Sequence, residues 1–241
     1  MKNLAIFDID GTLTKTTQVD DQCFVQSFVD ELGITDLDTN WSQYPAVCDS
    51  GITQHIFRTH LNRMPSAREI ALLQSRFVSL LEQAYERKPH LFIEIPGAGA
   101  ALQSLRQHPD WAIAIATGGW QVSALFKLNK AGIAVDGLPA AFADHGVTRE
   151  VILAAALVMA RHTYQQQHFA RIVYIGDGVW DVRTARQLQL GFLGVASGER
   201  EAALRAEGAR AIIQDFGDFD LFRQTLEELV YGKSVVCSPA K

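Results

Sequence analysis

Residues 4–13, with the sequence LAIFDIDGTL, limit the possible folds of this chain more than any other segment. The apolar run at 4–7 is typical of a strand buried on both faces of a parallel sheet. It ends at Asp8 and Asp10, and Gly11 then permits a tight turn. Acidic side chains at the end of a buried strand are costly unless they bind something. Because open α/β sheets bind ligands at the carboxyl ends of their strands, we expect this segment to open an α/β domain with a site at its tip.

The chain beyond Pro96 alternates between helical and strand-like patterns. Such a rhythm predicts a Rossmann-like, doubly wound parallel sheet with helices on both faces. Helices are expected at 98–107, 122–131, 149–161, 181–190, 199–207 and 220–230, and strands at 111–116, 140–143, 171–175, 192–196 and 211–213.

The segment 17–88 interrupts this alternation, because it contains no convincing strand. Apolar residues recur there at helical spacing, Gly33 can end one helix, and Ser66 opens a capping-box sequence that starts a long one. We therefore expect an α-helical cap at 17–88, inserted into a catalytic core made of 1–16 and 89–241. The tail at 232–241 is expected to be disordered.

Composition excludes several functional classes. The 241 residues are 48% hydrophobic, which is enough for a sizeable core, and no apolar run is long enough to span a membrane. The net charge of −5 disfavours nucleic acid as a partner. Three scattered cysteines and a first strand with no leader pattern before it favour a reducing cytoplasm. The oligomeric state stays open, with a monomer plausible.

Polar side chains follow several of the expected strands. Right-handed crossovers place the carboxyl ends of parallel strands on one edge of the sheet, so these side chains converge if their strands are neighbours. They are Asp8 and Asp10 after the first strand, Thr117 and Gly118 after the strand at 111–116, and Asp177 and Asp181 after the strand at 171–175.

With these motifs in this order around a helical insertion, the chain resembles the haloacid dehalogenase superfamily of phosphohydrolases. DIDGTL at 8–13 matches the family's first motif, Thr117 the second, and Gly176-Asp177 followed by Asp181 the fourth. The position of the insertion is similar to that in phosphoglycolate phosphatase and β-phosphoglucomutase. The resemblance covers nearly the whole chain.

The resemblance implies a Mg²⁺-dependent phosphatase that acts on a small phosphorylated metabolite. Asp8 would be the nucleophile that forms an aspartyl-phosphate, and Asp10 the general acid and then base. The ligands of Mg²⁺ would be Asp8, the backbone carbonyl of Asp10, and Asp177. Asp181 would act directly, through water, or by holding a cation. Thr117 and Gly118 would hold phosphate oxygens.

Charge balance demands one more group, because Asp8, Asp177, Asp181 and a phosphate dianion outweigh a single Mg²⁺. The family supplies a lysine before its fourth motif, whereas this sequence has Arg149 at the start of an expected helix. Arg149 is therefore the candidate cation, with a planar fork in place of a point charge. Outside this context, Arg149 reads as a surface residue and Thr117 as a helix N-cap.

Lys15 and Thr16 follow the first motif at the expected hinge and are candidates for substrate contact. A phosphomutase of the β-phosphoglucomutase type would need the same core residues and stays open as an alternative. Dehalogenases and phosphonatases lack an acid at the position of Asp10, so Asp10 disfavours both. A phospho-accepting signalling domain without turnover is a remote alternative, because it needs neither Asp10 nor a large helical insertion.

Overall fold

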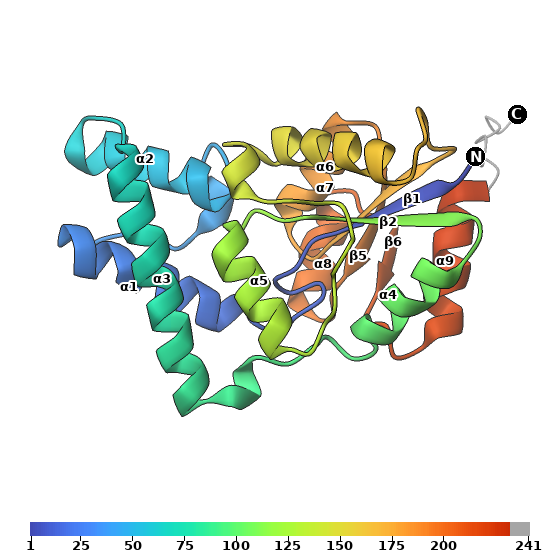
Figure 1. Ribbon diagram of the computed structural model, residues 1–241, viewed down its shortest axis with the longest axis horizontal. Coiled ribbons are helices and arrows are strands. Elements are labelled where there is room, and N and C mark those ends of the chain that lie inside the picture. Colours follow the sequence, from blue (N-terminus) through green and yellow to red (C-terminus); the bar gives the residue numbers. More distant parts are fainter. Residues whose placement is uncertain (232–241) are drawn as a thin grey trace, which may run out of the picture.

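The fold is an α/β structure built on a parallel sheet, as predicted. The computed structural model describes residues 1–231, so the expected disorder of 232–241 falls outside the described residues. Strand β1 (Asn3–Phe7) lies inside a six-stranded sheet of order β3-β2-β1-β4-β5-β6 (Figure 1). The other strands are β2 (Trp111–Ala116), β3 (Ala140–Ala141), β4 (Ile172–Gly176), β5 (Gly191–Val195) and β6 (Ala211–Ile213), and all pairings are parallel.

Helices cover both faces of the sheet, which is why β1 is buried throughout and apolar from Leu4 to Phe7. On one face Leu4 and Ile6 belong to the same apolar cluster as side chains of α6 and α7. On the other face Ala5 and Phe7 pack with α4, α5 and α9. The helices of the sheet domain have the bounds α4 (Ala98–Gln107), α5 (Gln121–Lys130), α6 (Arg149–Thr163), α7 (Val179–Gln187), α8 (Glu199–Ala206) and α9 (Phe219–Tyr231).

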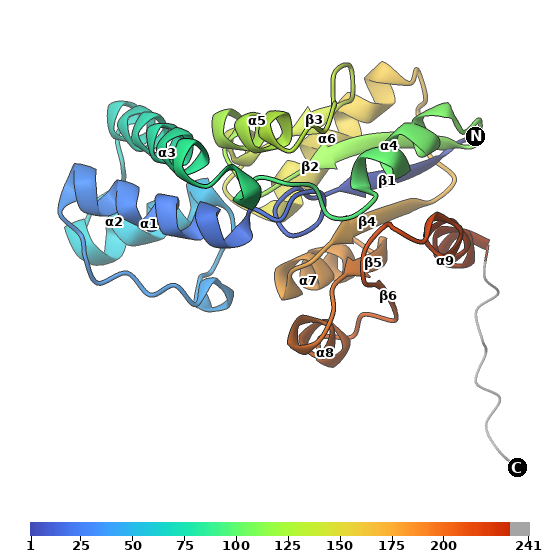
Figure 2. The same cartoon turned by 90° about the horizontal axis from the view of Figure 1, so that it is seen from below.

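Four α-helices lie between β1 and β2 in the chain, and the first three of them gather beyond one end of the sheet (Figures 1 and 2). We call residues 17–87 the inserted segment. It contains α1 (Thr17–Leu32), α2 (Asp49–Leu61), α3 (Ala67–Arg87) and the 3₁₀ turn η1 (Trp41–Gln43). The expected helix signals act here, since Gly33 ends α1 in the left-handed region and Ser66 forms both hydrogen bonds of a capping box with Glu69.

The inserted segment packs against the loops at the carboxyl ends of the strands. The Asp49 N–H donates to the Gly118 carbonyl at 2.7 Å, and the Ser50 hydroxyl donates to the Ala143 carbonyl at 2.7 Å. Trp120, which is fully buried, packs its ring against Phe24 with 5.7 Å between centroids. These contacts hold α1 and α2 directly over the strand ends.

The expected boundaries beyond Pro96 agree with the structure to within two residues, except that the helix expected at 181–190 ends at Gln187. Two of the smaller differences are informative. The helix expected from Asp181 begins at Val179, because Asp181 Oδ2 accepts the Gly178 N–H at 2.9 Å and lies inside the first turn. The strand expected at 140–143 contains only β3, since a 3₁₀ turn (Ala143–His145) follows it. Within residues 1–231 no helix is both long and apolar enough to cross a membrane.

Candidate active site

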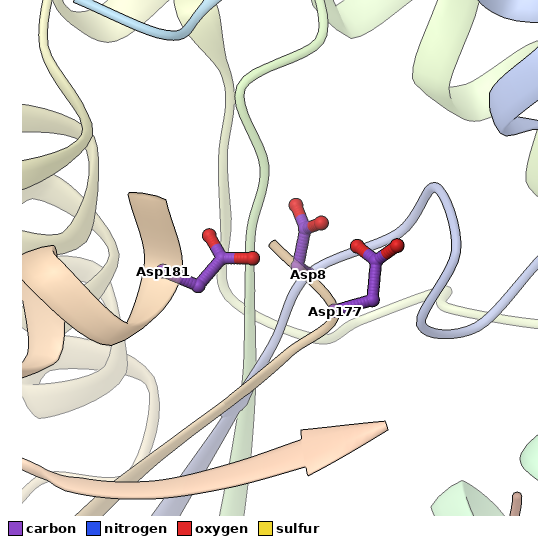
Figure 3. A group of neighbouring side chains, drawn as sticks. All are labelled: Asp8, Asp177 and Asp181. Atoms are coloured by element: carbon purple, nitrogen blue, oxygen red, sulfur yellow. The ribbon is translucent and has the colours of Figure 1, made fainter. Parts of the chain in front are cut away.

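Three buried aspartates meet at the carboxyl ends of β1 and β4. Each of Asp8, Asp177 and Asp181 offers one carboxylate oxygen, and these oxygens lie within 4.8 Å of one another. Figure 3 shows the carboxyl group of Asp8 between those of the other two. We call these residues the carboxylate cluster. Their charges are close enough that the cluster requires compensation by cations.

Sheet register and one glycine position this cluster. Phe7 pairs with Ile175 across β1 and β4, so Asp8, which follows β1, lies opposite Gly176, the last residue of β4, and one position before Asp177. Gly11 has φ of +78°, and a Cβ there would lie 2.0 Å from Asp177 Oδ2. The first motif therefore needs glycine both for its backbone conformation and to leave room for Asp177.

Arg149 supplies the cation that charge balance requires. Its Nη1 lies 2.8 Å from Asp181 Oδ1, 3.1 Å from the Tyr174 hydroxyl and 3.5 Å from Asp8 Oδ1. Its Nε donates to the Val47 carbonyl of the inserted segment at 2.7 Å. The guanidinium therefore joins the carboxylate cluster to the inserted segment through two different nitrogens held in one plane, whereas a lysine would offer a single point charge.

The protonation of the cluster reflects its burial. Burial raises the pKa of Asp8 to about 7; Arg149 opposes this shift, and Asp181 and Asp10 add to it. Burial, followed by the charges of Asp8 and Asp181, raises the pKa of Asp177 well above its usual value. Arg200 lies 3.1 Å from Asp177 Oδ2. Even with both arginines, the raised pKa values of Asp8 and Asp177 mean that these two carboxylates bind protons more tightly than free ones do, so further positive charge beside them is favourable.

The donor set fits a hard divalent cation. Carboxylate oxygens from two adjacent strand ends are the ligands that Mg²⁺ prefers. Asp181 is more fully engaged than the other two aspartates, because Oδ1 accepts from Arg149 and Tyr174 while Oδ2 accepts from Gly178. Of the three ways in which Asp181 could act, holding a cation is the one these contacts favour.

Asp10 lies beside the cluster with both carboxylate oxygens occupied. Oδ1 accepts from the Thr16 hydroxyl at 2.5 Å, and Oδ2 accepts from Lys127 Nζ at 2.6 Å. Lys127 also pairs with Asp20 of α1. Burial would lower the pKa of Lys127, but Asp10 and Asp20 raise it above its usual value, so the lysine stays charged.

Lys127 is the main residue that sequence reasoning missed. Its side chain is fully buried on the face of α5 that also buries Ala124 and Leu128. The signal was present in the sequence, because a lysine on the apolar face of an amphipathic helix needs a buried partner. Asp20 and Asp49 were also missed; they lie on helices of the inserted segment, where the sequence shows no motif.

The other expected residues divide between the cavity and its surroundings. Thr117 and Gly118 line the same cavity as Asp8, and a Cβ on Gly118 would lie 2.7 Å from Arg149 Nη2. Lys15, which is exposed, lines a different cavity with Gly11. Thr16 is fully buried and bonded to Asp10. The structure therefore does not bring Lys15 and Thr16 into the cavity, where they were expected to contact substrate. Lys15 points to solvent, and the Thr16 hydroxyl is taken up by its hydrogen bond to Asp10.

The cavity lies between the strand ends and the inserted segment and has a volume of about 250 Å³. This volume matches a small ligand. Its floor includes Asp8, Asp10, Thr117, Gly118, Arg149 and Asp177, and its opposite wall includes Asp20, Asp21, Phe24, Trp41, Asp49 and Ile52.

Comparison with known proteins places these features in a family. The family model for haloacid dehalogenase-like hydrolases matches residues 2–189. Among solved structures, a hydrolase from Pseudomonas syringae is 21% identical with a TM-score of 0.66, covering 92% of this chain and 98% of that one. No curated protein matches the sequence significantly.

Two further structures share the fold at lower identity. The β-phosphoglucomutase of Clostridium difficile is 16% identical with a TM-score of 0.65, covering 95% of this chain and 98% of that one. A protein from Haemophilus somnus described as a predicted phosphoglycolate phosphatase is 14% identical with a TM-score of 0.58, covering 92% and 98%. At these identities the likeness concerns the fold.

Proposed function

Because the chain belongs to the haloacid dehalogenase-like hydrolases, we propose that it is a Mg²⁺-dependent phosphatase that hydrolyses a small phosphorylated metabolite. One observation carries this proposal: Asp8 belongs to a buried carboxylate cluster at the strand ends, and Asp10 lies beside it. A nucleophile and a separate acid in one enclosed cavity are what hydrolysis through a covalent intermediate requires.

The metal would be held by Asp8, the backbone carbonyl of Asp10, and Asp177, with Asp181 holding Arg149 in place. When bound, Mg²⁺ would neutralise charge on the phosphoryl group and on Asp8. Arg149, the Thr117 hydroxyl and the Gly118 N–H would bind phosphoryl oxygens, and the Arg149 fork can do so while it remains on Asp181.

The reaction proceeds in two displacements. In the first, an oxygen of Asp8 forms a bond to phosphorus, the ester bond breaks, and Asp10 gives its proton to the leaving alcohol. In the second, Asp10 takes a proton from water, the water oxygen bonds to phosphorus, and the bond to Asp8 breaks. Free enzyme and inorganic phosphate result, and Asp10 is again protonated.

We take residues 17–88 to be a cap that closes over the cavity. Its contacts with Gly118 and Arg149 support this role, since both residues line the cavity. Closure would exclude bulk water from the aspartyl-phosphate until the alcohol leaves. We place the enzyme in the cytoplasm, where the buried free thiols of Cys23 and Cys48 would stay reduced.

Replacement of the nucleophile tests the proposal. Asp8→Asn preserves the shape of the side chain but removes the attacking oxygen, so phosphate release from p-nitrophenyl phosphate with Mg²⁺ should fall by about three orders of magnitude or more. Asp36→Asn, at an exposed carboxylate of the inserted segment, is the matched control and should retain activity. Substantial turnover by a correctly folded Asp8→Asn protein would rule out Asp8 as nucleophile.

A phosphomutase is the second candidate, because one structural neighbour is named a β-phosphoglucomutase. Incubation with β-glucose 1-phosphate separates the two. Isomerisation faster than phosphate release would identify a mutase, whereas release without isomerisation supports the phosphatase. Steady phosphate release from either ester also excludes a phospho-accepting signalling domain without turnover.

A further inference from the structure

The side chains in the cavity wall near Asp10 determine which alcohol group the substrate can carry. The leaving oxygen must lie next to Asp10, which protonates it, so the alcohol extends toward the groups that surround Asp10. Gly119 locates these groups, since a Cβ there would lie 3.8 Å from Lys127 Nζ and 3.9 Å from both Asp10 Oδ2 and Asp49 Oδ2. The alcohol therefore meets the inserted segment and its acidic side chains.

That wall is acidic and aromatic. Within the described residues, the inserted segment contributes Asp20, Asp21, Phe24, Trp41, Asp49 and Ile52 to it but no Lys, Arg or His. The arginines that line the cavity come from the sheet side and are already paired, Arg149 with Asp8 and Asp181, and Arg200 with Asp177. A second anionic group on the alcohol would face carboxylates across the cavity, which is strongly unfavourable.

Within residues 1–231, two of the wall carboxylates, Asp21 and Asp49, form no salt bridge of their own. Asp20 pairs with Lys127, but within residues 1–231 neither Asp21 nor Asp49 has a cationic nitrogen within salt-bridge distance. Asp49 is 92% buried, with Oδ2 accepting only the Trp120 N–H at 2.8 Å. The nearby charge of Lys127 opposes the burial-driven rise in the pKa of Asp49, but Lys127 already pairs with Asp10 and Asp20. A buried carboxylate without a salt bridge of its own is costly, and a cationic ligand would relieve that cost.

Aromatic rings stand beside these carboxylates. Trp41 Nε1 donates to Asp21 Oδ1 at 2.8 Å, and the Trp41 ring meets Phe24 edge to face with 5.9 Å between centroids. Asp21 therefore stands at the edge of the indole ring, and Trp41 and Asp21 both line the cavity. An organic ammonium group in the cavity can pair with the carboxylate and make a cation–π contact with the aromatic wall.

We propose that the substrate is a phosphomonoester of an amino alcohol, with an ammonium group held by Asp21, Asp49 and Trp41 and with no second anionic group. This inference rests on the proposed phosphatase function and narrows it to one substrate class. The short distance across a cavity of about 250 Å³ limits the alcohol to a few carbon atoms.

Three esters of similar length but different charge test the proposal. O-phosphoethanolamine carries an ammonium group, n-propyl phosphate is uncharged at that end, and phosphoglycolate carries a carboxylate. We expect kcat/KM to decrease in that order, with at least about a tenfold difference between the first and the last. Equal values, a faster neutral ester, or a faster carboxylate would each overturn the proposal.

A matched pair of variants tests the role of the wall. Asp21→Asn keeps an oxygen that can accept from Trp41 Nε1 but removes the charge, so the ratio of kcat/KM for O-phosphoethanolamine over n-propyl phosphate should fall by about fivefold. Asp36→Asn removes the same charge from an exposed loop and should leave that ratio unchanged. If both variants lower the ratio equally, or neither lowers it, the assignment of Asp21 is wrong.

The experiments give different results if the ammonium site is wrong and if the phosphatase function is wrong. If p-nitrophenyl phosphate is hydrolysed with Mg²⁺ but the three alkyl esters are not discriminated by charge, only the ammonium site is excluded. If no phosphomonoester is hydrolysed, the phosphatase function itself fails, and the inference with it.

Discussion

Lys127 shows at the scale of a single residue how this site is held together. Its ammonium group is fully buried and is shared by Asp10, which follows β1, and Asp20, which lies on α1. Buried ion pairs are not strong stabilisers compared with apolar residues, but removal of one partner leaves the others as unpaired buried charge. Lys127 is thus needed to keep Asp10 in position beside the cavity and to keep α1 near it.

Lys127→Met should therefore destabilise the protein by about 3–5 kcal/mol, because Asp10 and Asp20 lose their common cation. Urea unfolding followed by circular dichroism measures this change in the free energy of unfolding. Lys88→Met, at an exposed lysine just after α3, should cost less than about 0.5 kcal/mol. Equal effects of the two substitutions would contradict a structural role for the Lys127 ion pairs.

At the scale of elements, α3 supports the inserted segment. It buries Leu73, Phe77 and Leu81, and the Phe77 ring packs against Phe24 of α1 with 5.6 Å between centroids. Phe24 in turn lines the cavity. The start of α3 is fixed by Ser66, whose hydroxyl accepts the Glu69 N–H at 3.3 Å, while Glu69 accepts the Ser66 N–H at 2.9 Å.

Ser66→Ala removes one side of this capping box and should lower the free energy of unfolding by about 1 kcal/mol. Thermal unfolding of the purified variant measures the loss. Ser79→Ala, inside the same helix, is the matched control and should cause little change, since alanine favours helix interiors. A Ser66→Ala protein as stable as the wild type would show that packing alone sets the start of α3.

At the scale of the whole molecule, the cavity concentrates negative charge between the inserted segment and the sheet. Burial raises the pKa of Asp8 and of Asp49 to about 7, against 3.8 for a free carboxyl. The folded protein therefore binds more protons than the unfolded chain between these values. The contribution of these two groups to stability is fully present below about pH 4 and is lost as the pH rises through about 7.

Mg²⁺ should reverse part of this loss, because it takes the place of protons in the carboxylate cluster. We expect the metal to raise the melting temperature most at and above about pH 7, by an amount equivalent to about 2.7 kcal/mol at a hundred times its Kd. In EDTA the melting temperature should fall as the pH rises through about 7. Scanning calorimetry at several pH values, with and without Mg²⁺, measures both effects.

Asp177→Asn provides the control for this prediction, since it removes a ligand of the proposed site. The metal-induced shift should disappear in Asp177→Asn and persist in Asp36→Asn. An equal shift in both variants would mean that Mg²⁺ stabilises the protein through general screening and not at the carboxylate cluster.

The local pattern of residues was sufficient to predict the elements and the order in which they occur. Apolar runs, caps and glycines act over a few residues, so the strand at β1, the alternation after Pro96, and the capping box at Ser66 could be read directly. The convergence of Asp8 and Asp177 also followed, because parallel strands with right-handed crossovers leave their carboxyl ends on one edge.

The sequence by itself thus determined the fold class, the family motifs and the edge of the sheet where the acidic groups gather. Only the tertiary structure decided which charges share one space: that Lys127 joins Asp10 to Asp20, that Arg149 reaches Val47, and that Asp49 comes close to Asp10 beside Gly119. The physical reason is the distance along the chain over which each interaction acts. Backbone preferences act between neighbours in the chain, whereas the pairing of buried charges depends on how the inserted segment packs against a sheet whose residues lie far away in sequence.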